Sequence, residues 1–336
     1  MNDDPLQSPP PRAGRAVWLA AAVAGAGLLV VYFVFFYDKG GDGNAEAAVS
    51  QLTLADIPFD GTRAYDYLKK LCEIGPRPSG SPGMAAQQKL LEEHFRKQGA
   101  HVAYQRFRGR HPRDGSAVEM ANMLIHWHPE SKQRVLLAAH YDTLPFPLKD
   151  PHNPGGRFVG ANDNASGVAL LMELGSEIGK LKCAYGIDFL MIDAEEFIFT
   201  QRDEHFLGSQ HFAREYVRNP PPYRYRWAVL LDMIGDRDLQ IYHERNSAWW
   251  KDSQPLLHEI WGIAARLGVR EFIPRRKYEI LDDHIALHEI GKIPIIDIID
   301  YDYAVWHTED DTPEQCSALS LAKVGWVMKE WLQTVK

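Results

Sequence analysis

The sequence predicts an α/β fold in three layers: a mixed, mostly parallel central sheet with helices on both faces, preceded by one transmembrane helix. Two observations support this fold. Short β-rich runs alternate with helical apolar spacing along most of the chain. The runs that begin near residues 135, 187 and 227 are almost wholly apolar, as expected of central strands that are buried on both faces.

The first element is an uncharged segment from Ala16 to Tyr37. About 22 residues at 1.5 Å each span about 33 Å, which is enough to cross a bilayer. Arg12 and Arg15 precede the segment, so the positive-inside rule places the N-terminus in the cytoplasm and the rest outside it. We expect a cytoplasmic tail (1–15), an anchor (16–37), a linker (38–51) and a globular domain (52–336). The alternative is a signal peptide cleaved near residues 45–48.

The globular region then shows alternating patterns. Helical spacing predicts helices over Arg63–Glu73, Met84–Gln98, Ala165–Ile178, Gly208–Tyr216, Gln254–Leu267 and Ser317–Leu332. β-Rich runs predict strands over His101–Phe107, Ala121–Trp127, Arg134–His140, Ile187–Ile192, Trp227–Leu231 and Ile293–Ile299.

Composition excludes one class of partner. The net charge of −8 argues against a nucleic-acid-binding protein, which normally carries a basic face.

The three cysteines, Cys72, Cys183 and Cys316, include no CxxC pair. This favours a role as small apolar residues buried in the core. One disulfide remains open, and the odd count prevents complete pairing.

Polar residues gather where predicted strands end. His140 and Asp142 end one strand, Glu195 and Glu196 follow another, and Asp232 ends a third. Open α/β sheets place their sites at this edge.

Five residues from this edge and its neighbouring loops are candidate metal ligands: His140, Asp163, Glu196, Asp232 and His307. Imidazole nitrogen and carboxylate oxygen suit Zn²⁺. Carboxylates crowded together would repel one another unless a cation lay among them. Each residue alone has an ordinary explanation, such as a helix N-cap for an aspartate. Their joint placement at successive strand ends favours a metal site.

The order and spacing of the motifs resemble the zinc aminopeptidase family. The motifs are GPRPSGSPG (75–83), HYD, GANDNASG, the Glu-Glu pair, LGSQHFA, DMIG, DDH and the His-Thr before DD. The resemblance extends from residue 60 to the end of the chain. It implies a zinc exopeptidase-like fold and a catalytic domain over 52–336.

Three features are similar to a non-hydrolytic branch, the glutaminyl-peptide cyclotransferases, which convert N-terminal Gln or Glu to pyroglutamate. FIFTQRDEHFL (197–207) separates the Glu pair from the Leu-Gly-Ser turn, the segment LDDHI resembles that of the cyclases, and Trp306 precedes His307. A membrane-anchored form also exists in this branch. Two features differ: DNASG is typical of the peptidases, and Ala139 stands where some cyclases have a cysteine.

The cyclase resemblance implies one Zn²⁺ bound by Asp163, Glu196 and His307. Glu195 is then the general base and acid, and Asp232 and Asp282 hydrogen-bond around it. Trp306 forms a wall of the substrate pocket, or alternatively belongs to ordinary packing. His140 and Asp142 orient the ligands.

The aminopeptidase alternative uses the same residues in a two-metal site. His140 and Asp232 then hold the second zinc, Asp163 bridges the two ions, and Glu195 activates a metal-bound water. In either case the substrates are peptide or protein N-termini, the N-terminal helix contacts the membrane, and no nucleic acid is involved. A third class, an inactive extracellular binding domain, conflicts with the complete set of ligands.

Overall fold

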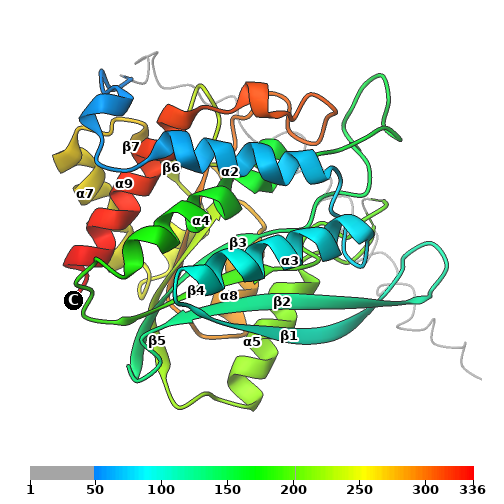
Figure 1. Ribbon diagram of the computed structural model, residues 1–336, viewed down its shortest axis with the longest axis horizontal. Helices are drawn as coiled ribbons and strands as arrows, with labels where there is room; N and C mark the ends of the chain where they lie inside the picture. The colour runs from blue at the N-terminus through cyan, green and yellow to red at the C-terminus, as the bar shows by residue number, and fades with distance from the viewer. Residues whose placement is uncertain (1–48, 201) are drawn as a thin grey trace, which may run out of the picture. The chain divides into compact units, whose positions relative to one another are not determined.

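The central sheet has six strands in the order β1-β2-β4-β3-β5-β8 (Figure 1). Their bounds are β1 (His101–Arg110), β2 (Ala117–Trp127), β3 (Gln133–His140), β4 (Gly186–Ile192), β5 (Arg224–Asp232) and β8 (Ile295–Ile299). Strands β4, β3, β5 and β8 run parallel, whereas β1 and β2 add an antiparallel hairpin at one edge. The predicted mixed, mostly parallel sheet is confirmed.

This computed structural model describes residues 49–200 and 202–336. The predicted tail, the anchor at 16–37 and nearly all of the linker therefore lie outside the described residues. Within these two ranges, no helix has the length and apolar character needed to cross a membrane.

Helices cover both faces of the sheet. One face carries α2 (Gly61–Ile74), α3 (Pro82–Lys97), α4 (Ser166–Ile178), α7 (Gln254–Leu267) and α9 (Ala318–Thr334). The other carries α5 (Leu207–Arg218) and α8 (Asp283–Glu289). Alternate residues of β3 enter the two apolar cores: Val135 and Leu137 face the first group, and Leu136 and Ala138 face the second. Because β3 is buried on both faces, its sequence shows an uninterrupted apolar run.

Local capping explains several helix boundaries. Asp60 accepts a hydrogen bond from the backbone N–H of Arg63 at the start of α2, and Ser81 caps α3 in the same way, with a proline directly after it. Ser317 begins α9. Each side chain satisfies a backbone N–H that the helix itself leaves free. Gly75 ends α2 with a φ of 90°, a conformation that favours glycine.

Short elements escaped the sequence prediction. A two-stranded sheet pairs β6 (Ile241–His243) with β7 (Phe272–Arg276), and α6 (Arg245–Trp249) and α8 were also missed. The helical turns η1 (Leu54–Asp56), η2 (Ala161–Ala165) and η3 (Pro313–Gln315) complete the described elements. All of these are too short for apolar periodicity to show. The β1–β2 hairpin extends beyond its predicted ends because its tip is mostly exposed and polar.

All three cysteines lie in the described part of the chain and are free thiols. Cys72 and Cys316 are buried, in agreement with their prediction as small apolar core residues. Cys183 is only partly buried.

Candidate metal centre

The predicted ligands meet at one edge of the sheet. His140 is the last residue of β3 and Asp232 the last of β5, while the Glu195–Glu196 pair follows the end of β4. Because these three strands are parallel, their carboxyl ends fall at the same edge. Asp163 reaches it from η2, and His307 from the loop after β8.

Asp163 lies at the middle of the cluster. Its Oδ1 is 3.1 Å from His140 Nε2, and its Oδ2 is 3.2 Å from His307 Nε2. On the first side, His140 Nε2 is also 3.3 Å from Asp232 Oδ1. On the second side, His307 Nε2 is 2.8 Å from Glu196 Oε1. The carboxylate therefore joins two half-sites: His140–Asp163–Asp232 and Asp163–Glu196–His307.

Burial and crowding perturb these groups. Burial, together with the charge of Asp163, raises the pKa of Glu196 to about 8. Burial raises the pKa of Asp232 to about 7. The pKa of His307 rises to about 9 because the Glu196 and Asp163 carboxylates outweigh its desolvation. The Glu196 and Asp232 carboxyls thus resist ionisation and the His307 imidazole attracts a proton, as expected of a site that lacks positive charge. Asp163 differs, because hydrogen bonds and charges from His140 and His307 outweigh its burial and hold its pKa below the usual value.

The donor set fits Zn²⁺. His140 Nδ1 and Asp232 Oδ1 are buried without a hydrogen-bond partner, and one ligand atom each from His140, Asp163 and Glu196 lies within 4.8 Å of the others. Nitrogen and oxygen donors in this arrangement match the ligands of catalytic zinc. A cation would neutralise the excess negative charge and give Asp232 Oδ1 a partner.

Two further carboxylates position the ligands through backbone amides. Asp142 accepts the backbone N–H of Glu195 at 3.1 Å and that of Glu196 at 3.0 Å. Asp311 accepts the N–H of Asn162 at 2.8 Å, that of Asp163 at 3.2 Å, and the Tyr303 hydroxyl at 2.6 Å. Asp142 therefore orients the glutamate pair rather than a histidine: His140 Nδ1 is 3.8 Å from Asp142 Oδ1, beyond hydrogen-bond range.

Asp311 and Arg77 were not among the predicted site residues. Arg77, in the GPRPSG motif, is fully buried and donates to the carbonyls of Val159 and Gly160 at 2.9 and 3.2 Å. It thereby fixes the chain just before η2, which carries Asp163. Asp311 belongs to the Asp doublet after His307. The GPRPSG motif and this doublet were both visible in the sequence, but neither indicates which backbone groups the side chains of Arg77 and Asp311 bind.

Glu195 occupies a different environment from its neighbour. It is only half-buried, so substrate can reach it, and its carboxyl makes no hydrogen bond within the described residues. Burial raises its pKa well above the usual value, and the charges of Glu196 and Asp282 add to this effect. Both backbone polar groups of Glu195 are hydrogen-bonded: its N–H donates to Asp142, and its carbonyl accepts the Phe206 N–H at 3.2 Å. A carboxyl with a raised pKa and no hydrogen-bond partner is a candidate for proton transfer.

Asp232 and Asp282 flank this region, but neither hydrogen-bonds to Glu195 in the described part of the chain. Asp282 caps α8 through the backbone N–H of Asp283, and its Oδ2 is buried without a partner. Asp282 also belongs to a second buried group with His284 and Asp297. The acid roles assigned to Asp232 and Asp282 remain predictions.

Trp306 closes one side of the centre. Its indole N–H donates to Asp163 Oδ2 at 3.1 Å, and its ring centroid is 4.9 Å from that of Tyr301. Met233, which follows Asp232, belongs to the same apolar cluster. Trp306 therefore contacts a predicted ligand and does not merely fill the core.

Backbone strain also marks the site. Ala194, Met233 and His307 have positive φ angles of 57°, 47° and 62°. Each is a predicted ligand or lies within two residues of one. Such conformations are costly for residues other than glycine and persist where surrounding structure imposes them, often at functional sites.

The segment 197–207 returns to the glutamate pair. Leu207 N–H donates to the Ala194 carbonyl at 3.0 Å, so the segment is closed at its base. Phe197 and Phe199 pack against Met120 and Phe107 of the β1–β2 hairpin.

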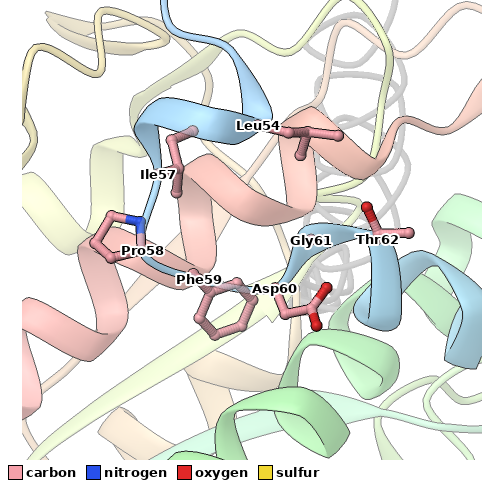
Figure 2. A pocket seen from close by; sticks show the side chains of 7 residues that line it. All are labelled: Leu54, Ile57, Pro58, Phe59, Asp60, Gly61 and Thr62. Carbon is pink, nitrogen blue, oxygen red and sulfur yellow. The ribbon is translucent and has the colours of Figure 1, made fainter.

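A separate hollow lies away from the metal centre (Figure 2). It has a volume of about 320 Å³, is lined by Leu54 and residues 57–62, and contains none of the predicted site residues.

Known proteins share this architecture or sequence, and three of them serve as examples. Glutaminyl cyclase from Fimbriiglobus ruber superposes with a TM-score of 0.80 at 37% identity, covering 83% of this chain and 96% of that one. A leucine aminopeptidase precursor from Bacteroides thetaiotaomicron superposes with a TM-score of 0.77 at 30% identity, covering 83% and 98%. Glutaminyl-peptide cyclotransferase from Boiga irregularis is 24% identical over 238 residues, or 62% of this chain.

The match spans 64% of the length of that Boiga irregularis relative. The model of peptidase family M28 matches residues 122–332, which include every predicted ligand and acid of the site. The chain therefore belongs to peptidase family M28.

Proposed function

We propose that this chain is a zinc-dependent glutaminyl-peptide cyclotransferase, an acyltransferase that converts N-terminal Gln or Glu of peptides to pyroglutamate. The observation that carries the proposal is Trp306, whose indole N–H binds the ligand carboxylate of Asp163. The ring closes one side of the centre, where its centroid is 4.9 Å from that of Tyr301. The similarity to the Fimbriiglobus ruber glutaminyl cyclase over 83% of the chain supports the same conclusion.

Asp163, Glu196 and His307 would hold the zinc, which supplies Lewis-acid polarisation of the substrate γ-carbonyl. The substrate's own α-amine attacks the γ-carbon. Glu195 accepts a proton from this amine and delivers it to the departing nitrogen, so that the C–N bond of the side-chain amide breaks and ammonia leaves. Asp142 keeps Glu195 in place by accepting the Glu195 backbone N–H, and burial raises the pKa of the Glu195 carboxyl, which favours its role as a proton acceptor and donor.

One observation favours a second candidate, a two-metal aminopeptidase. His140 and Asp232 complete a second half-site with Asp163, and the leucine aminopeptidase precursor of Bacteroides thetaiotaomicron shares the fold at 30% identity. In that reaction Glu195 would take its proton from water instead of from the substrate amine. The two candidates differ in product and in metal count.

The test offers the protein a Gln-initiated peptide and, separately, a Leu-initiated peptide. We expect pyroglutamate from the first, little free leucine from the second, and one zinc per chain by elemental analysis. His140→Ala should keep this zinc, because the cyclase site does not require that imidazole. Two tightly held zincs together with efficient leucine release would establish the aminopeptidase instead.

We also propose that the segment 16–37 anchors the enzyme in a membrane, with the catalytic domain on the extracytoplasmic side. The support is its uncharged length and the arginines before it. N-terminal sequencing of the mature protein should recover residues that precede the anchor. A mature start near residue 49 would show that the segment is removed.

A further inference from the structure

Lys149 lies at the edge of the metal centre, in the loop between β3 and η2. Its ammonium nitrogen is 3.1 Å from the centroid of the Trp306 ring, and its backbone N–H donates to the His307 carbonyl at 3.1 Å. The edge of the same indole binds Asp163. One tryptophan therefore connects the lysine ammonium, on its face, to a ligand carboxylate, at its edge.

The Lys149 ammonium has no carboxylate partner within the described residues. The carboxylates whose charges act on it are those of Asp163 and Glu196 in the centre. Two acidic side chains of the neighbouring loops, Asp150 and Glu309, bind backbone N–H groups instead. Asp150 accepts the backbone N–H of His152 and of Glu309. Glu309 accepts the backbone N–H of Arg157 at 2.7 Å. Lys149 is exposed, so the N–H groups of its ammonium are available to a ligand.

A second cation flanks the same loop. The Arg113 guanidinium lies 4.9 Å from the ring of Phe146 and 4.8 Å from that of Phe199. It too makes no salt bridge among residues 49–200 and 202–336. Phe146 precedes Lys149 by three residues, and Phe199 follows the glutamate pair. Lys149 and Arg113 are thus two cations near this loop that pair with no carboxylate in the described part of the chain, although the whole chain carries a net charge of −8.

We propose that Lys149 determines substrate specificity by binding a carboxylate of the peptide just downstream of the residue that is cyclised. The inference rests on the proposed cyclase function. The neutral side-chain amide of the substrate would enter the centre, and the rest of the peptide must leave past the exposed rim, where Lys149 lies on the Trp306 face. Lysine offers only donors and a positive charge, so an anionic acceptor is its natural partner.

The size of the effect follows from exposure. A solvent-exposed ion pair changes an equilibrium by roughly twofold to fivefold. The contact would be made to a part of the peptide that does not react, equally in the ground and transition states, so it should lower KM and leave kcat unchanged. Trp306 keeps its own bond to Asp163 when Lys149 is replaced.

The experiment measures kcat and KM of the full chain for three amide-capped peptides: Gln-Glu-Ala-NH₂, Gln-Gln-Ala-NH₂ and Gln-Lys-Ala-NH₂. Gln-Ala and Gln-Ala-NH₂ form a second pair that tests a C-terminal carboxylate instead of an acidic side chain. Each set is repeated with Lys149→Met, which keeps the length and stacking, and with Lys149→Arg, which keeps the charge. Lys182→Met is the matched control, because Lys182 is exposed and precedes β4 at the opposite end of the sheet.

We expect the wild type to prefer the carboxylate-bearing member of at least one set by about threefold to fivefold, through KM. Lys149→Met should abolish this preference, whereas Lys149→Arg and Lys182→Met should keep it. An unchanged preference in Lys149→Met, or a fall in kcat for every peptide alike, would overturn the inference while leaving the cyclase intact. A failure to form pyroglutamate from any of the peptides would overturn both proposals.

Discussion

Replacement of Asp311 by asparagine tests whether the metal centre depends on a residue that touches no metal. Asp311 is fully buried, and its two oxygens accept three hydrogen bonds, two of them from the backbone of η2. Asparagine has the same shape but only one acceptor oxygen. If that oxygen keeps the bonds to Asn162 and Tyr303, the new NH₂ group faces the backbone N–H of Asp163.

The cost can be worked out from this geometry. A buried donor left without an acceptor costs about 1–3 kcal/mol. A loss near 2 kcal/mol lowers Tm by roughly 4 °C in a domain of this size. Because the lost bond fixes the backbone of Asp163, zinc affinity should also fall by about 10- to 100-fold, the usual effect of removing a group that orients a ligand.

Asp310→Asn is the matched control, because Asp310 is the preceding residue in the chain and is exposed. Thermal unfolding of the metal-free protein and a competitive zinc-chelator titration measure the two effects separately. Asp310→Asn should change neither. If Asp311→Asn also kept both the wild-type Tm and the wild-type zinc affinity, the backbone of Asp163 would not depend on Asp311 and the reasoning would be refuted.

Three other predictions follow from the same structure. Glu195→Gln should keep its zinc but lose about 10²-fold or more in kcat, the scale of a positioned acid–base group; near-normal turnover would remove Glu195 from the mechanism. Glu196→Gln and His307→Ala should each lose zinc and activity together, and retained zinc stoichiometry in both would disprove the ligand assignment; exposed Glu204→Gln is the control. Burial alone would raise the pKa of Asp188, but hydrogen bonds from His126 and Arg134 hold it below the usual value. Its contribution to the free energy of unfolding is thus complete above about pH 4 and is lost as the pH falls further. In urea unfolding from pH 5 to pH 2, Asp188→Asn should flatten the pH dependence; an unchanged slope would show that the shift does not exist.

The layered fold could be predicted because its central strands are buried on both faces. All seven residues of β4 are buried. A strand buried on both faces needs an almost wholly apolar sequence, which strands and helices at the surface do not have. The long helices were predicted for a related reason, since each packs one apolar face against the sheet. Elements of only three to five residues, such as β6 and α6, are too short to show such a pattern and were missed.

The candidate site was predictable to the extent that it follows from strand direction. Parallel strands bring His140, Glu196 and Asp232 to one edge, so their approach could be inferred before any contact was known. The bridging position of Asp163, with one oxygen facing each imidazole, was expected only from the aminopeptidase resemblance, because it depends on the backbone path through η2. The hydrogen bonds of Asp142 and Asp311 were equally inaccessible, since they end on main-chain amides that have no side-chain signature.

The cluster around Asp163 joins residues that are distant along the chain, from His140 to His307. An unfolded chain cannot hold these groups together, so a zinc ion at the proposed site would bind the native state far better than the denatured ensemble. By mass action, free zinc at 100 times its dissociation constant would stabilise the folded chain by about 2.7 kcal/mol. The enzyme's resistance to heat and proteolysis would then vary with the zinc supply of its compartment, and a chelator would act on the lifetime of the fold as well as on turnover.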